Sequence, residues 1–374
     1  MGMIGGGIGS FIGDVHRKAA SIDGMIDLVC GAFSSSEERS IASGKALFLP
    51  EDRCYGSFEE MILKEKELPD GIKMDFVSIV TPNHLHFPPA KLALENGFHV
   101  VCDKPMTLTL DEAIELEVIV EKSNCLFALT HNYTGHPMVK QAKAMVANGD
   151  LGEIRKIQVQ YLQGWLSTSL ESTGQKQATW RVDPKRSGIG GALGDIGTHA
   201  ENLVEYITGL KIDELAADLG RFGKGRTLDD DGNLLLRMEN GAKGTMSFSQ
   251  IALGEENNLA VRVYGEKGSI EWHQENPNLL ISRWLDKPKK LFTPNGNDLY
   301  PEAVSRIPAG HPEGYLEAFA TIYKNFFTHL MAVINGETIE KPDYPNVKDG
   351  IRGMQFIYAS VKSDSQNSAW TKIE

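Results

Sequence analysis

The sequence predicts an α/β protein with two domains, the first of them a parallel sheet with helices on both faces. Three observations predict this fold. The chain has 374 residues, more than one ordinary hydrophobic core accommodates. Short apolar runs alternate with amphipathic helical stretches from residue 3 to about residue 130. Beyond residue 131, strand-like segments follow one another across short turns, which favours antiparallel pairing. We therefore expect domains at residues 1–130 and 131–374.

The first domain is expected to hold five strands with helices between them. The strand candidates are residues 3–4, 26–33, 76–80, 99–102 and 126–129. The helix candidates are residues 11–21, 57–66, 85–96 and 110–122. Alternation of strand and helix implies that the strands run parallel. Almost no strand precedes the first glycines, so the first strand is either very short or begins upstream of Met1.

The second domain is expected to hold six or more strands. The candidates are residues 154–162, 214–219, 232–238, 242–249, 260–264 and 268–272. Residues 285–312 are rich in Pro, Gly and Asn, which predicts a long loop over the surface or over a site.

Composition excludes several classes of protein. The net charge is −12 and no basic cluster is present, so neither nucleic acid nor an anionic membrane is an expected partner. No apolar run approaches the roughly 18–20 residues that cross a bilayer, and the N-terminus lacks the pattern of a signal peptide. The four cysteines, Cys30, Cys54, Cys102 and Cys125, are widely spaced. Buried thiols in a reducing cytoplasm are expected, rather than disulfides or a zinc site.

A glycine-rich turn separates the first strand from the first helix. Gly5 and Gly7 occupy the first two places of a G-x-G-x-x-G fingerprint, and Ser10 occupies the third. Glycines permit the tight turn and let the main chain approach a pyrophosphate at the helix N-terminus. A glycine-rich terminus is a weak signal alone, but the strand before it and the helix after it favour a dinucleotide site. The expected cofactor-binding residues here are Gly5, Gly7, Ile8, Gly9 and Ser10.

The acidic residue that usually binds the ribose at the end of the second strand is missing. Ser34 is the best match to that position, followed by Ser35 and then Arg39. Serines with a nearby arginine suit the 2′-phosphate of NADP. Ser34 suits the plain ribose hydroxyl of NAD equally well, and a helix-capping serine run is compatible with both. NAD and NADP therefore both remain open.

Two further segments lie at carboxyl ends of predicted strands, where open α/β sheets bind ligands. After the third strand come Thr81, Pro82, Asn83 and His86, which we expect to line the cofactor cleft. His84 and His86 lack a third ligand, so no metal site is expected.

After the fourth strand come Asp103, Lys104 and Pro105. A surface lysine is the ordinary interpretation of such a position. A lysine at the mouth of a cofactor crevice is instead partly desolvated, which suits it to handling protons. Pro105 favours that interpretation, because it restricts Lys104 to extended geometry.

Asp195 and His199 follow the glycine-rich run at residues 188–194 and precede a helical pattern that ends at Gly209. Residues four apart share a helix face, so a carboxylate and an imidazole would point the same way. Such a pair suits a site where a hydroxyl loses its proton while a neighbouring group fixes the substrate. The alternative is an N-cap aspartate with a partly buried helix histidine.

These motifs resemble, in order and spacing, the glucose–fructose oxidoreductase/inositol dehydrogenase family (Gfo/Idh/MocA). The resemblance rests on the glycine turn with His16, on Asp103-Lys104-Pro105, and on the segment with Asp195 and His199. It implies a Rossmann domain followed by an α+β domain on a large, mostly antiparallel open sheet, which commonly forms the oligomer interface. It also implies catalytic roles for Lys104, Asp195 and His199, and a cofactor contact for Asp103, which replaces the family's usual glutamate.

The resemblance places five residues at the substrate: Tyr133, Gln163, Trp165, Arg181 and His311. Aromatic rings with several hydrogen-bond donors are how a protein holds a polyol. For each of them, ordinary packing or a surface loop is an equally good interpretation from the sequence alone. Within the family the chain resembles dehydrogenases of sugars or anhydrosugars such as levoglucosan.

We therefore expect a cytoplasmic NAD(P)-dependent dehydrogenase that oxidises a secondary hydroxyl of a sugar, anhydrosugar or cyclitol. The expected assembly is a homodimer or homotetramer. The alternatives are an NAD-dependent glycosidase on the same scaffold and a non-catalytic sensor of the cofactor. The presence of Lys104, Asp195 and His199 together disfavours a sensor, which needs no acid–base groups.

Overall fold

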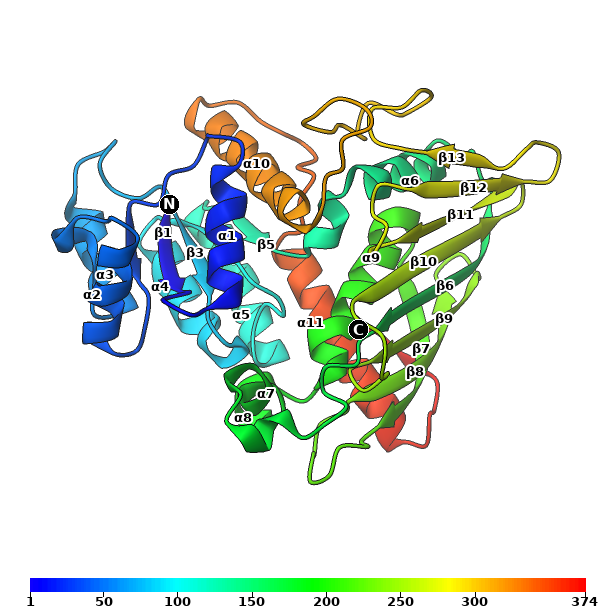
Figure 1. Cartoon of the computed structure of the whole chain (residues 1–374), viewed down its shortest axis with the longest axis horizontal. Coiled ribbons are helices and arrows are strands. Elements are labelled where there is room, and N and C mark those ends of the chain that lie inside the picture. Colours follow the sequence, from blue (N-terminus) through cyan, green and yellow to red (C-terminus); the bar gives the residue numbers. More distant parts are fainter. The chain divides into compact units, whose positions relative to one another are not determined.

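The computed structural model describes residues 1–374, which divide into two units (Figure 1). Unit 1 comprises residues 1–132 and 319–354, and unit 2 comprises residues 133–318 and 355–374. The sequence predicts a single boundary near residue 130. The structure returns residues 319–354 to the first unit, because an apolar helix late in the chain carries no local signal of which core it joins.

Unit 1 is built on a parallel sheet of five strands in the order β2-β1-β3-β4-β5. The strands are β1 (Gly2–Gly5), β2 (Cys30–Ala32), β3 (Phe76–Val80), β4 (His99–Cys102) and β5 (Phe127–Leu129). The chain reverses its direction of progress across the sheet between β1 and β3, which are neighbours. Ligands of such sheets bind outside the carboxyl ends of the strands at this reversal. The predicted doubly wound sheet is confirmed.

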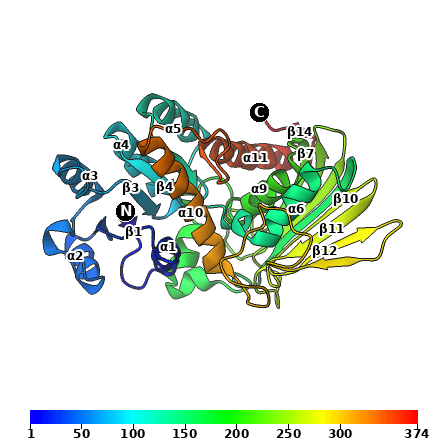
Figure 2. The same cartoon turned by 90° about the horizontal axis from the view of Figure 1, so that it is seen from above.

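Helices cover both faces of this sheet (Figure 2). On one face, α3 (Phe58–Glu67) packs on α4 (Phe87–Glu95), which packs on α5 (Leu110–Ser123). On the other face lie α1 (Phe11–Ser21) and α10 (Tyr315–Ile334). The helix α2 (Glu37–Ala46) follows β2 and the serines at residues 34–36. It is not among the helices that the sequence predicts.

A buried polar chain joins α1, β3 and α10. Tyr323 Oη lies 2.8 Å from His16 Nδ1 and 2.7 Å from Ser78 Oγ. Burial lowers the pKa of His16 to about 4, so its imidazole is neutral at physiological pH. These three side chains are fully buried and hydrogen-bonded to one another, which ties the late helix α10 to the core of unit 1.

Unit 2 is built on a nine-stranded sheet in the order β13-β12-β11-β10-β6-β9-β8-β7-β14. Its strands are β6 (Ile154–Leu162), β7 (Ile212–Gly220), β8 (Asp231–Met238), β9 (Lys243–Ser249), β10 (Asn258–Gly265), β11 (Gly268–His273), β12 (Leu280–Trp284), β13 (Lys290–Phe292) and β14 (Thr371–Lys372). Only β6 and β9 pair in parallel; all other neighbours are antiparallel. The mostly antiparallel sheet is thus confirmed.

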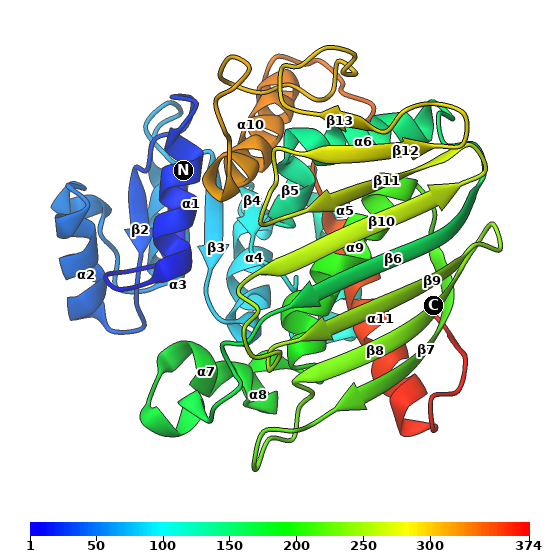
Figure 3. The same ribbon diagram turned by 45° about the vertical axis from the view of Figure 1, so that its right-hand side comes forward.

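One face of this sheet is covered and the other is open (Figure 3). The covering helices are α6 (Pro137–Ala147), α9 (Thr198–Thr208) and residues 355–365 of α11 (Val347–Ser365). Side chains of a strand alternate between faces, so Ile157, Val159 and Tyr161 are buried beneath the helices. Gln158 and Gln160 point to the open face. No helix of the protein combines the length and apolar character needed to span a membrane.

Glu65 on α3 is a fully buried carboxylate on which unit 1 depends. Its oxygens accept two hydrogen bonds of 2.7 Å from Arg53, one of 2.7 Å from Tyr55 Oη and one of 2.9 Å from Met74 N. Removing it leaves the Arg53 guanidinium partly buried without its anion.

We predict that Glu65→Ala lowers the free energy of unfolding by about 3–5 kcal/mol, because it breaks a buried ion pair. Urea denaturation monitored by circular dichroism measures this value. The control is Glu67→Ala, at an exposed position of the same helix, with an expected change below about 0.5 kcal/mol. Equal effects of the two substitutions would contradict the prediction.

Candidate functional site

The turn between β1 and α1 has the geometry of a nucleotide-binding loop. Gly5 and Gly9 adopt φ of +80° and +82°, which side chains rarely tolerate. Ser10 caps α1, its hydroxyl accepting the N–H of Gly13 at 3.3 Å. Gly7 N donates to Phe33 O and Ile8 N donates to Ser43 Oγ, each at 3.2 Å, so these two groups brace the turn against α2 and the end of β2. Gly9 is exposed, and nothing lies within 4 Å of the place that a Cβ on it would occupy.

The close approach that the fingerprint requires is made at Gly13 and not at the predicted third position, Ser10. A Cβ on Gly13 would lie 2.3 Å from the Cα of Gly6. Only glycine therefore lets α1 pack this closely on the turn. The spacing of the motif alone does not reveal this, because the turn is longer than the fingerprint assumes.

The residues after β2 lie at the start of α2. Ser34 is half-buried, and its hydroxyl accepts the N–H of Ser36 at 3.2 Å. Ser36 in turn caps α2 by accepting the N–H of Arg39. Ser35 and Arg39 are exposed. No carboxylate stands at the end of β2, as the sequence indicates.

His86 links the two loops that follow β3 and β4. Its Nε2 lies 2.7 Å from Thr81 O and its Nδ1 lies 2.8 Å from Pro105 O. The ring is buried, and burial lowers its pKa. Thr81, beside Pro82 and the buried Asn83, is thereby held against the loop that carries Lys104.

Lys104 is half-buried at the end of β4, and the peptide bond to Pro105 is cis. Asp103 fixes the main chain there. Its Oδ1 accepts Lys104 N and Thr130 Oγ1, both at 2.9 Å. Asp103 is shorter than the family's usual glutamate. Its carboxylate joins the main chain at Lys104 to Thr130, the residue after β5. Thr81, His86, Asp103 and Lys104 thus form one cluster within unit 1.

Asp195 in unit 2 is held by two donors. Its Oδ2 accepts Arg181 Nε at 2.9 Å and Gln250 Nε2 at 2.8 Å. Arg181 also donates to the side chain of Gln177, and its guanidinium lies 4.3 Å from the ring centre of Trp180. An ionised carboxylate between a guanidinium and an amide is fixed in orientation, and the ion pair remains partly solvated.

The turn that carries Asp195 is π-helical. It spans Leu193–Gly197 and continues into α9, which ends at Gly209 in the left-handed conformation. The sequence predicts one regular helix with Asp195 and His199 on its first turn. Because a π-turn has a wider helical repeat, the two residues occupy different positions from those that an α-helix would give them.

His199 lies buried among aromatic rings. The ring of Tyr133 is 4.8 Å away in an edge-to-face arrangement, and the ring of Tyr161 is 6.2 Å away. Tyr133 Oη and Tyr161 Oη are 2.6 Å apart, and burial raises the pKa of both hydroxyls. The imidazole is therefore held in place by neutral phenols.

An amide network extends from these tyrosines. Asn257 accepts Tyr161 Oη at 2.7 Å and Gln163 Nε2 at 2.9 Å through its Oδ1. Gln163 accepts Trp165 Nε1 at 3.1 Å. Four residues of the predicted substrate set, Tyr133, Gln163, Trp165 and Arg181, therefore lie around Asp195 and His199 in unit 2. The fifth, His311, lies exposed on a loop, where its Nδ1 is 3.1 Å from Pro308 O.

Sequence reasoning did not identify Tyr161, Asn257 or Gln250. Tyr161 has a signal, since it stands on the buried face of its strand two residues before Gln163. Gln250 and Asn257 have none, because each is an ordinary polar residue at the end or start of a strand. No group of three or more His, Cys, Asp or Glu side chains gathers in a way that could hold a metal.

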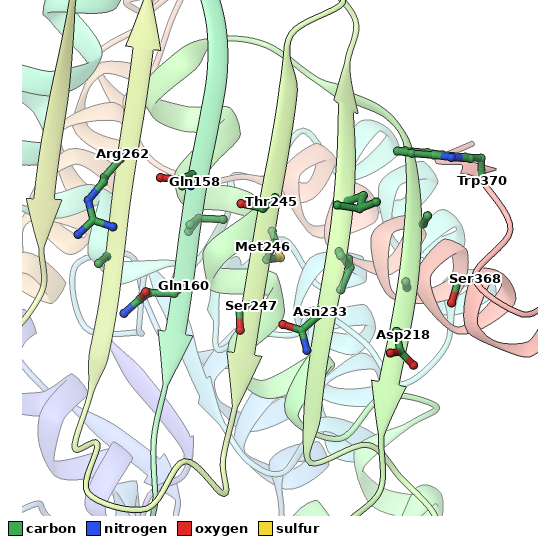
Figure 4. A pocket seen from close by; sticks show the side chains of 16 residues that line it. Gln158, Gln160, Asp218, Asn233, Thr245, Met246, Ser247, Arg262, Ser368 and Trp370 are labelled. Atoms are coloured by element: carbon green, nitrogen blue, oxygen red, sulfur yellow. The ribbon is translucent and has the colours of Figure 1, made fainter.

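A hollow of about 650 Å³ lies on the open face of the sheet (Figure 4). Gln158, Gln160, Asn233, Thr245 and Trp370 are among its lining residues. Gln158 and Gln160 alternate with Tyr161 along β6, so the hollow lies on the face of the sheet opposite to Tyr161 and the neighbouring His199.

Two family descriptions match the chain. Residues 1–131 match the oxidoreductase family with an NAD-binding Rossmann fold, and residues 139–271 match the GFO/IDH/MocA C-terminal domain.

Three relatives show how far the similarity extends. The inositol dehydrogenase homolog of Azotobacter vinelandii, complexed with NAD⁺, is 36% identical with a TM-score of 0.95, covering 99% of this chain and 96% of that one. Its structure with NADH and myo-inositol gives 35% identity and a TM-score of 0.90 over the same shares. An oxidoreductase of Sinorhizobium meliloti is 46% identical with a TM-score of 0.88, covering 99% and 98%. Levoglucosan dehydrogenase of Pseudarthrobacter phenanthrenivorans is 29% identical over 100% of this chain and 97% of its own.

Proposed function

The chain belongs to the Gfo/Idh/MocA family of NAD-binding oxidoreductases, and from that premise we propose the reaction and the residues that perform it. The protein is a dehydrogenase that oxidises a secondary hydroxyl of a sugar, anhydrosugar or cyclitol. The observation that carries the proposal is the cluster of Asp195 and His199 among amide, guanidinium and aromatic groups. Polar donors beside aromatic rings are what a polyol needs in a desolvated pocket.

The glycine turn fits the pyrophosphate of NAD, because Gly9 leaves open space at the N-terminus of α1. When bound, the nicotinamide accepts the hydride from the substrate carbon. Without a carboxylate after β2, Ser34, Ser35 and Arg39 leave room for the 2′-phosphate of NADP. We therefore propose that both cofactors are accepted.

His199 takes the hydroxyl proton as the carbon loses its hydride, because an imidazole ordinarily titrates near neutral pH. Lys104 donates a hydrogen bond to the reacting oxygen and stabilises the negative charge that develops there. Asp195 accepts a hydrogen bond from a neighbouring hydroxyl and so orients the reacting carbon. Tyr133, Gln163, Trp165 and Arg181 bind the remaining hydroxyls, and His311 is assigned to the rim of the site.

The proposal is tested by the absorbance of reduced nicotinamide with inositols, hexoses and levoglucosan, each with NAD and with NADP. We expect reduction with one class of these substrates. Cofactor binding without reduction of either cofactor would overturn the proposal. Glycoside cleavage without net reduction would then identify an NAD-dependent glycosidase, and no turnover of any glycoside would identify a sensor.

We predict that Lys104→Ala and His199→Ala each abolish turnover, a loss of at least about 100-fold in kcat, because each removes a group acting on the reacting oxygen or its proton. Affinity for NADH, measured by fluorescence titration, is expected to persist. Lys122→Ala, at an exposed position of α5, is the control and should turn over normally. Nearly full activity of both variants would contradict the assignment.

We also propose that the open face of the sheet joins two copies of the chain into a homodimer or homotetramer. Leu235 on β8 is 53% exposed on this face. Glu271 on the same face is partly buried, which opposes its ionisation, but hydrogen bonds from His273, Arg262 and Arg283 lower its pKa to about 2. The face therefore combines an exposed apolar side chain with paired charges, as protein interfaces do. The four cysteines are free and buried, which supports the proposed cytoplasmic location.

We predict that Leu235→Arg shifts the protein towards monomers, because it replaces an exposed apolar side chain of that face with a charge. Light scattering after size-exclusion chromatography measures the mass. Leu285→Arg, in an exposed loop outside the face, is the control and should leave the mass unchanged. A wild-type protein that is monomeric at micromolar concentration would refute the assembly.

A further inference from the structure

Asp229 is a buried carboxylate to which neither the sequence motifs nor the mechanism assigns a role. It lies just before β8 and is 4% exposed. Its Oδ1 accepts Gly191 N at 2.7 Å and its Oδ2 accepts Leu193 N at 2.6 Å. Its main-chain oxygen accepts Ala192 N at 2.9 Å. Three consecutive N–H groups at residues 191–193 thus bind a single residue 36 or more positions later in the chain.

These N–H groups stand at the beginning of the helical segment that carries Asp195 and His199. The first N–H groups of a helix have no partner within the helix, and a carboxylate is their strongest acceptor. Ser, Thr or Asp close by in sequence usually supplies this cap. Here the cap comes from the connection between β7 and β8, so it fixes the position of the helix start relative to the sheet as well as satisfying its donors.

Gly191 makes the approach possible. A Cβ at this position would lie 2.1 Å from Asp229 O, so any side chain would push the turn away from the carboxylate. Burial raises the pKa of Asp229 to about 6, although the N–H groups of Leu193 and Gly191 oppose that rise. A buried carboxylate at this position carries a cost in stability, which indicates that its fit to the turn serves the site.

Asp230, the next residue, is linked to Asp195 through Gln250. Asp230 O accepts Gln250 N at 2.9 Å, and the side chain of Gln250 donates to Asp195 Oδ2 at 2.8 Å. The carboxylate of Asp230 is itself anchored by Phe222 N, Gly223 N and Arg226. The two residues before β8 therefore determine both the main chain that bears Asp195 and the amide that orients its carboxylate.

We propose that Asp229 is a positioning residue of the dehydrogenase, fixing the π-helical turn so that Asp195 and His199 meet the substrate in register; this rests on the function proposed above. Asp229→Asn preserves the size of the side chain but turns one acceptor into an NH₂ group, which must face the N–H of Gly191 or Leu193. The turn then moves or loosens, and misplacement of reacting groups by about 1 Å costs on the order of 100-fold in rate.

The test measures kcat, the KM for the sugar and the NADH affinity of Asp229→Asn, using the best substrate of the panel and myo-inositol. We expect kcat, normalised to the concentration of sites that bind NADH, to fall by about 10- to 100-fold. The affinity for NADH should stay unchanged within twofold. Hydrogen exchange of the peptide that contains residues 190–195 should accelerate. Gly191→Ala pushes the turn away from Asp229, because the added Cβ would lie 2.1 Å from Asp229 O. It should give the same result, and it replaces Asp229→Asn in the test if that variant does not fold.

The matched control is Glu205→Gln. Glu205 is a buried carboxylate at the other end of α9, where it accepts Ile212 N at 3.0 Å and Lys211 Nζ at 2.6 Å. Its replacement should destabilise unit 2 without lowering kcat more than about threefold. An equal loss of kcat in Glu205→Gln, or faster exchange in Asp229→Asn with kcat preserved, would overturn the proposal. If the wild-type protein oxidises no substrate of the panel, the proposed function fails. Independently of that result, unchanged hydrogen exchange at residues 190–195 in Asp229→Asn would overturn the role of Asp229.

Discussion

A carboxylate that is taken out of water must accept hydrogen bonds from groups that folding has brought to it, and both units of this protein are organised around that requirement. In unit 1, Glu65 gathers an arginine, a tyrosine and a main-chain N–H. In unit 2, the carboxylate of Asp229 accepts two N–H groups of the turn before α9, and its main-chain oxygen accepts a third. Each site requires a distant segment to lie in one place only, so local conformation at the site depends on tertiary structure.

Around Lys104 the environment is polar but mostly uncharged. Burial lowers the pKa of His16, His86 and His131, so these neighbouring imidazoles are neutral near pH 7. His86 places its two ring nitrogens against two carbonyl oxygens, Thr81 O and Pro105 O, and so links the loops that carry them. Fixed dipoles of this kind cost no reorganisation when charge develops on a substrate oxygen, which is the advantage of a preorganised site.

The sequence predicts the parts of the fold that follow from local pattern. Alternating strands and helices identify the Rossmann unit, and Asp195 with His199 are found from spacing after a glycine run. The π-helical turn is not predictable from local pattern, because the N–H groups at its start bind Asp229, which lies beyond the next strand of the chain, β7. Spacing assigns the third fingerprint place to Ser10, whereas the close contact is made by Gly13 against Gly6. The helix at residues 315–334 is not among the predicted elements, and nothing local in its sequence shows which sheet it covers.

The single parallel pair in the sheet of unit 2 has a further consequence. Because β6 and β9 run in the same direction, both end at the same edge, and Gln163 N donates to Ser249 O there at 2.8 Å. About eighty residues separate the two strands in sequence, and within them lie Trp165, Arg181, Asp195 and His199. The chain leaves this edge at the carboxyl end of β6 and is back at it at the carboxyl end of β9. The short helices at residues 170–187 lie outside both strands, so a change in their length leaves the register of β6 and β9 unaltered.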